Sequence, residues 1–120
     1  MKTVIQIICL PLIFLFASDS LSAQQEKKKV ETTEFQVTGV CKMCKKRIEN
    51  AALIKGVKWA EWTKETNTFK VVYKTQNVTV EEIHQAIAQS GHDTDMVKAD
   101  EKSYKKLPKC CRYRDGVKIH

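Results

Sequence analysis

The sequence predicts a small α+β sandwich, in which two helices cover one face of an antiparallel sheet. Three observations predict it: segments of alternating apolar and polar residues, two segments with apolar residues at helical spacing, and the order of these segments. The order is β-α-β-β-α-β, the split βαβ arrangement of ferredoxin-like sandwiches. The chain has 120 residues, enough for one small domain with a C-terminal tail.

The chain begins with the features of a secretory signal peptide. Lys2 precedes an apolar stretch over 7–17, and small and polar residues follow over 18–23. The apolar stretch is too short to span a bilayer comfortably. We therefore expect residues 1–23 to be removed, no transmembrane segment in the mature chain, and an exported, periplasmic protein.

The domain is expected over residues 31–98, between a flexible arm at 24–30 and a basic, cysteine-containing tail at 99–120. Residues 30–97 hold as many basic as acidic side chains, so the net charge of +7 resides in residues 24–29 and 98–120. A basic tail can bind nucleic acid, a membrane or an acidic partner. We expect no nucleic-acid partner, because the chain is predicted to be exported.

The first strand is expected over 33–38, where Phe35 and Val37 share one face of an alternating segment. A loop containing Gly39 leads into the first helix, which carries an apolar stripe at helical spacing. We expect this helix to end near Gly56, because glycine suits the C-terminus of a helix.

Two further strands are expected over 57–63 and 67–74, joined by a turn at 64–66. Trp59 falls on the outer face of the first of these strands. The alternation of the two strands places five side chains on the inner face: Ala60, Trp62, Phe69, Val71 and Tyr73.

Thr79 and Glu82 form a capping box, which opens a second helix that we expect to run to Ser90. Gly91 ends this helix, and residues 94–98 can supply a short edge strand. The buried stripe of the helix is expected to consist of Val80, Ile83, Ala86 and Ile87.

Cys41 and Cys44 lie where the first helix begins. Unpaired backbone N–H groups and the helix dipole favour thiolate over thiol at this position. Two thiolates at this spacing can converge on one ion, and soft sulfur ligands select Cu(I), Zn(II) or similar thiophilic metals. Two sulfurs suit a low coordination number better than the four ligands of a structural zinc site. We therefore expect the pair to hold a soft metal ion and pass it on.

Cys110 and Cys111 lie in the tail. Exported proteins commonly pair their cysteines in disulfides. Adjacent cysteines rarely bridge each other without strain, because the connecting peptide constrains the geometry. We therefore expect these two to have partners elsewhere: a metal ion, the first cysteine pair or another chain.

Residues 31–98 resemble the heavy-metal-associated domain family, which is shared by copper chaperones, the N-terminal modules of metal pumps and the periplasmic mercury-binding protein. Three features carry the resemblance: Cys41-x-x-Cys44 after the first strand, Gly56-Val57 opening the second, and residues 88–92 closing the second helix. The resemblance implies a ferredoxin-like fold and a metal site at the first cysteine pair.

The metal loop departs from the family pattern at Gly39, two positions before Cys41. The family usually has a methionine there, which packs beneath the metal loop. Here Met43 lies inside the cysteine pair instead. Because of this departure, the resemblance does not predict the shape of the loop or which metal it prefers.

The resemblance places His92 beside the metal loop, where a neutral imidazole nitrogen could act as a third ligand. The alternative for His92 is an exposed loop histidine. We expect His84 to lie on the surface of the second helix.

The tail resembles an extension of exported bacterial members that ends in Cys-Cys-x-Tyr. Three roles are open for Cys110 and Cys111: extra sulfur ligands, a disulfide with the first pair, or contact with a partner protein.

The function that the resemblance implies is binding and transfer of Cu(I) by an exported metallochaperone, with a metal-transport or efflux protein as donor or acceptor. Capture of Hg(II) is the first alternative. Zn(II) or Cd(II) would suit additional sulfur ligands, and a metal-bridged homodimer is a further arrangement.

A thiol–disulfide oxidoreductase is the second alternative function, because C-x-x-C at a helix start also carries redox chemistry. Against it, the strand order differs from that of thioredoxin; we expect no enzyme.

Overall fold

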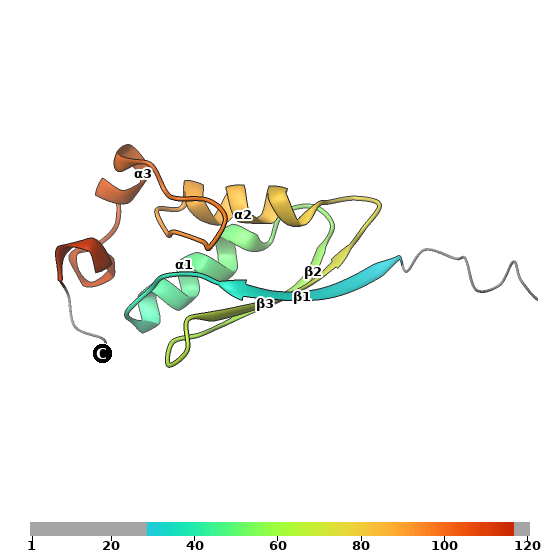
Figure 1. Cartoon of the computed structure of the whole chain (residues 1–120), viewed down its shortest axis with the longest axis horizontal. Coiled ribbons are helices and arrows are strands. Elements are labelled where there is room, and N and C mark those ends of the chain that lie inside the picture. The colour runs from blue at the N-terminus through green and yellow to red at the C-terminus, as the bar shows by residue number, and fades with distance from the viewer. Residues whose placement is uncertain (1–28, 117–120) are drawn as a thin grey trace, which may run out of the picture.

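The computed structural model describes residues 29–116, so the predicted signal peptide and most of the arm lie outside the described residues. Three antiparallel strands form a sheet in the order β1-β3-β2, and two helices cover one of its faces (Figure 1). The arrangement confirms the predicted α+β sandwich. Its elements are β1 (Val30–Gln36), α1 (Lys42–Ala52), β2 (Val57–Thr63), β3 (Thr68–Lys74) and α2 (Val80–Gln89).

The sheet is built on β3, which pairs with β1 on one side and with β2 on the other. The bounds of β2 are those predicted, whereas β3 starts one residue later than predicted. Asn67 causes the difference, because its φ of 57° is left-handed backbone that belongs to the hairpin turn. Asparagine tolerates that conformation better than most residues.

The predicted edge strand over 94–98 is wrong. Thr94 makes a single isolated bridge with Val37, at the position beside β1 where a fourth strand would lie. The Thr94 hydroxyl accepts hydrogen bonds from the backbone N–H groups of Met96 and Val97. A side chain that bonds its own backbone in this way favours a turn over a sheet ladder.

The end of α1 also differs from the prediction. The helix ends at Ala52, and the N–H of Leu53 bonds to the carbonyl of Asn50. Gly56 lies in the turn before β2 with φ of +100°, and a Cβ there would lie 2.8 Å from the Cβ of Asn77. Glycine is therefore required at this turn and not as the helix cap. By contrast, α2 begins as predicted, with the Thr79 hydroxyl accepting from the N–H of Glu82.

The core lies between the sheet and the helices, and the inner-face prediction for the strands is largely confirmed. Trp62, Phe69 and Val71 are almost completely buried, and Trp59 is exposed on the outer face. The predicted stripe of α2 is confirmed at Ile83 and Ile87, while its other two members are only partly buried. The core side chains of the sheet and helices include Phe35, Val37, Ile48, Trp62, Phe69, Val71, Ile83 and Ile87.

The prediction of a surface position for His84 is wrong. The side chain is buried and stacks on the Phe35 ring, with ring centroids 3.7 Å apart. Its Nδ1 lies 2.6 Å from the Thr94 hydroxyl oxygen, which satisfies one ring nitrogen. Burial lowers the pKa of His84, so the ring packs as a neutral aromatic group.

After α2, the chain folds back over the end of the sandwich where α1 begins (Figure 1). This part contains a short helix, α3 (Glu101–Lys105), and two 3₁₀ turns, η2 (Lys109–Cys111) and η3 (Tyr113–Asp115). Tyr104, Leu107 and Cys111 are buried there. Within residues 29–116, no helix has the length and apolar character needed to cross a membrane.

Candidate metal centre

Cys41 is the residue that caps the N-terminus of α1. Its backbone is extended, with φ of −148° and ψ of 171°, and its Sγ accepts a hydrogen bond of 3.4 Å from the N–H of Cys44. The sulfur thus replaces the oxygen that usually satisfies the first free N–H groups of a helix. Cys44 lies in the first turn and is completely buried. Both sulfurs therefore lie at the positive end of the helix dipole.

Trp62 fills the space beneath the metal loop. Its indole carbons would lie 2.7 and 2.9 Å from a Cβ at Gly39, closer than side-chain carbons normally approach. Its Nε1–H donates to the carbonyl of Val37 at 2.9 Å, which holds the ring under the loop. A larger side chain at position 39 would collide with this ring. The packing therefore accounts for the departure from the family pattern noted above.

The tail brings a third sulfur to the cysteine pair. The Sγ of Cys41 lies 3.2 Å from that of Cys44 and 3.4 Å from that of Cys111. The three sulfurs lie within 4.8 Å of one another, and all three residues are buried. Cys110 is partly exposed, with its Sγ 3.8 Å from that of Cys41. All four cysteines in the described residues are free thiols.

Cys41 is the electrostatic centre of this cluster. Burial alone would raise its pKa, but hydrogen bonds from Cys44, and then from Cys111 and Cys110, outweigh burial and lower the pKa to about 7. Burial raises the pKa of Cys44, and burial together with the neighbouring Cys44 and Cys41 sulfurs raises that of Cys111. A hydrogen-bonded thiolate is favoured over an unpartnered one, and a second buried charge beside it is disfavoured. Above about pH 7, the metal-free cluster therefore holds one negative charge, centred on Cys41.

His92 is neither an exposed loop residue nor a member of the sulfur cluster. It is completely buried, and its Nδ1 lies 2.9 Å from the carbonyl oxygen of Thr38, at the start of the metal loop. Its Nε2 has no hydrogen-bond partner. Burial lowers the pKa of His92 to about 4, so the ring is neutral near pH 7 and Nδ1–H donates to Thr38. The imidazole therefore ties the metal loop to the loop after α2.

Tyr113 and Arg114 fasten the tail over the loop that contains His92. The Tyr113 hydroxyl donates to the carbonyl of Gly91 at 2.8 Å and accepts from the N–H of Asp93 at 2.9 Å. The Arg114 guanidinium binds the Asp93 carboxylate at 2.6 Å and lies over the Tyr104 ring, 4.5 Å from its centroid. We call these contacts of Tyr113 and Arg114 the latch. The latch was not predicted from the sequence, where its only local signal is the tyrosine two residues after Cys111.

We expect Tyr113→Phe to loosen the latch and expose Cys111. The change leaves the N–H of Asp93 and the carbonyl of Gly91 without their partner, which costs about 1–3 kcal/mol when such groups are buried. Urea unfolding should show lower stability, and a thiol reagent should label Cys111 faster, as followed by mass spectrometry. Tyr73→Phe is the matched control, because it removes a hydroxyl bond to Glu31 instead. Equal labelling of Cys111 in both variants would contradict the prediction.

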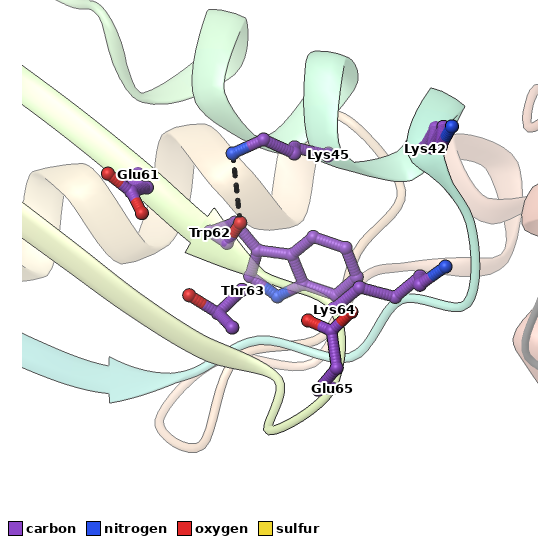
Figure 2. A pocket seen from close by; sticks show the side chains of 7 residues that line it. All are labelled: Lys42, Lys45, Glu61, Trp62, Thr63, Lys64 and Glu65. Carbon is purple, nitrogen blue, oxygen red and sulfur yellow. Dashed lines mark hydrogen bonds between the residues drawn. The ribbon is translucent and has the colours of Figure 1, made fainter.

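A shallow depression of about 300 Å³ lies beside the metal loop, between the start of α1 and the end of β2 (Figure 2). Three lysines line it, Lys42, Lys45 and Lys64, and the Nζ of Lys45 donates to the carbonyl of Trp62 at 3.1 Å. None of its lining residues is a cysteine. The candidate metal centre is therefore the buried sulfur cluster and not this depression.

Solved structures of metal-binding proteins are similar to this chain. A "CopZ metallochaperone" is 30% identical; the match covers 53% of this chain and 98% of that one, with a TM-score of 0.52. The N-terminal domain of a potential copper-translocating P-type ATPase from Bacillus subtilis, in the Cu(I)-loaded state, is 28% identical over 54% of this chain and 84% of that one, with a TM-score of 0.52.

Oxidized MerP from Ralstonia metallidurans CH34 is 24% identical over 55% of this chain and 94% of that one, with a TM-score of 0.52. At this identity, the likeness shows the fold alone. Neither a family sequence profile nor a curated protein sequence matches the chain. These matches cover only about half of this chain.

Proposed function

This chain belongs to the heavy-metal-associated domain family, and from this membership we propose that it binds Cu(I) through Cys41, Cys44 and Cys111 and passes the ion to another protein. The observation that carries the proposal is the cluster of three buried free thiols within 4.8 Å of one another. Soft thiolates select soft ions such as Cu(I). The similarity to a Cu(I)-loaded domain of a potential copper-translocating P-type ATPase supports copper as the cargo.

The spacing of the sulfurs favours three-coordinate binding. With metal–sulfur bonds of about 2.3 Å, sulfur atoms are about 4.0 Å apart around a trigonal ion and about 4.6 Å apart around a linear one. The distances from Cys41 Sγ to the other two sulfurs are 3.2 and 3.4 Å, so both need only a small outward movement to reach the trigonal arrangement. A third sulfur should hold the ion more firmly than Cys41 and Cys44 alone.

Transfer would proceed by ligand exchange, in which thiolates of the acceptor bind the ion while the sulfurs of this chain leave one at a time. Cys111 can leave first, because it lies on the tail, whereas Cys41 and Cys44 are held by α1. The acceptor or donor is a metal-transport or efflux protein. The protein acts after export, in the periplasm, in keeping with its predicted signal peptide.

Two alternatives have less support. Hg(II) binds the same thiolates, but the likeness to MerP extends to the fold alone. A thiol–disulfide oxidoreductase needs an attacking thiolate that its substrate can reach. Cys41 is only 4% exposed, beneath the folded tail, which does not favour attack on a protein disulfide.

We expect Cu(I) binding to release about two protons at pH 8 and about three at pH 6. The reason is that Cys41, with its pKa lowered to about 7, is already a thiolate at the higher pH, whereas the raised pKa values of Cys44 and Cys111 keep both protonated. Affinity should therefore rise with pH, and more steeply below pH 7. Anaerobic addition of Cu(I) in weak buffer with a pH indicator measures the release. A value of about one at pH 8 would contradict the third sulfur ligand.

The function is tested by titrating the reduced protein with Cu(I) against a competing chelator. Wild type should hold the ion tightly, and the double variant Cys41→Ser/Cys44→Ser should lose it. Wild type should then give up the ion to an excess of a stronger thiol chelator within minutes, as transfer requires. Unchanged binding in the double variant would overturn the proposal, and tight Hg(II) binding without tight Cu(I) binding would replace copper with mercury.

A further inference from the structure

Two sulfur atoms lie at the outer edge of the buried cluster. Cys110 is partly exposed on η2, and its Sγ lies 3.8 Å from the Sδ of Met43. Met43, on the first turn of α1, is 48% exposed. The Sγ of Cys110 also lies 3.8 Å from that of Cys41. The proposed function uses neither Cys110 nor Met43, although both are soft donors beside the sulfur cluster.

We propose that Cys41, Cys110 and Met43 form a second Cu(I) site, in which the Cys41 sulfur is shared between an inner and an outer ion. The inference rests on the proposed function, because the inner ion is the one held by the buried cluster. It adds a second ion and a thioether ligand, which lies between the two cysteines of the C-x-x-C motif.

The distances suit a second ion. A three-coordinate ion with metal–sulfur bonds of about 2.3 Å holds its sulfurs about 4.0 Å apart. Cys110 Sγ lies 3.8 Å from each of its two proposed co-ligands, which is nearer to that value than either distance from Cys41 Sγ to its partners in the buried cluster. A thiolate sulfur has three lone pairs, so Cys41 can donate one pair to each ion.

The thioether decides which ion fits the outer site. Methionine sulfur is a soft ligand that binds Cu(I), whereas zinc sites are built from cysteine, histidine and carboxylate side chains. Two thiolates with one thioether therefore favour Cu(I) over Zn(II). Because Met43 is exposed while Cys44 and Cys111 are buried, the outer ion is the one that an acceptor can reach first.

The test counts the Cu(I) ions that the purified, reduced protein holds, by native mass spectrometry and by chelator competition for each ion. Wild type is expected to bind two Cu(I) but one Zn(II), and Cys110→Ser to bind one Cu(I). Met43→Leu, which keeps the side-chain volume, should weaken the second ion at least about tenfold and leave the first unchanged, since even the loss of a supporting group weakens metal sites on this scale.

Met96→Leu is the matched control, because Met96 is an exposed methionine in the turn after α2. It should bind two Cu(I) with wild-type affinities. Saturation of wild type at one Cu(I), or identical titrations of Met43→Leu and Met96→Leu, would overturn the second site and leave the proposed function standing. Failure of wild type to hold any Cu(I) would overturn both.

Discussion

A serine at position 41 is expected to abolish tight Cu(I) binding, with a larger effect than a serine at position 44 or 111. The Sγ of Cys41 lies within 3.8 Å of the other three cysteine sulfurs in residues 29–116, and Cys41 is the only one of the buried three whose pKa is lowered. Removing it takes away the centre of the cluster and its negative charge. Removing Cys44 or Cys111 leaves the Cys41 sulfur, whose pKa is lowered, with one neighbouring sulfur 3.4 or 3.2 Å away, and this pair can still hold the ion.

Sites with four ligands bind structural zinc with about 10–16 kcal/mol, or about 3 kcal/mol for each ligand. Loss of Cys41 should therefore weaken the first Cu(I) at least about a hundredfold. The fold should survive, because serine is a favoured N-cap and can accept the hydrogen bond from the N–H of Cys44. Chelator competition measures the affinity, and circular dichroism checks α1. A Cys41→Ser protein that binds within about tenfold of wild type would contradict this central role.

The second large effect concerns stability in acid, and His92 is expected to cause it. Burial lowers the pKa of His92 to about 4, whereas an unfolded chain has a histidine pKa of about 6.5. Because the folded state binds this proton less readily, the stabilisation is complete above pH 6.5 and is lost as the pH falls from 6.5 to 4. The loss should reach about 3 kcal/mol at pH 4.

His92→Asn should remove this part of the pH dependence. An asparagine amide can keep a bond to the Thr38 carbonyl but carries no titrating group in this range. Urea unfolding of the metal-free protein at pH 7 and pH 4.5 measures the difference in each variant. His84→Asn is a useful comparison, since the lowered pKa of His84 adds a separate contribution with the same sign. If wild type and His92→Asn lost equal stability on acidification, the assignment to His92 would be wrong.

Much of the fold could be predicted from the sequence, because its signals are local. The hairpin of β2 and β3 follows from alternation over residues 57–74, and the start of α2 follows from Thr79 and Glu82. In each case the residues that decide the structure lie within a few positions of one another. Predictions were wrong where the residue behind them has another structural role. Gly56 lies in the turn before β2 instead of ending α1. The Thr94 hydroxyl bonds nearby backbone N–H groups, so residues 94–98 form a turn instead of an edge strand.

The buried histidines show the limit of local patterns. His84 lies beside the expected stripe of α2, yet it is buried because Phe35 and Thr94 provide a stacking surface and a hydrogen-bond partner. Phe35 is 49 positions away in the chain, so no helical periodicity could reveal the contact. Local periodicity also could not reveal the hydrogen bond of His92, because its partner Thr38 is 54 positions away.

The sequence alone determined that Cys41 and Cys44 lie together at a helix N-terminus, because a spacing of three residues on one helical turn requires it. Only the tertiary structure decided that Cys111, 70 positions further along, completes the cluster, with Cys110 and Met43 at its edge. The physical reason is that the tail has no periodicity that specifies its own position. It is held by long-range contacts of Tyr113 and Arg114 with the loop after α2, and these contacts place the third sulfur against the first two.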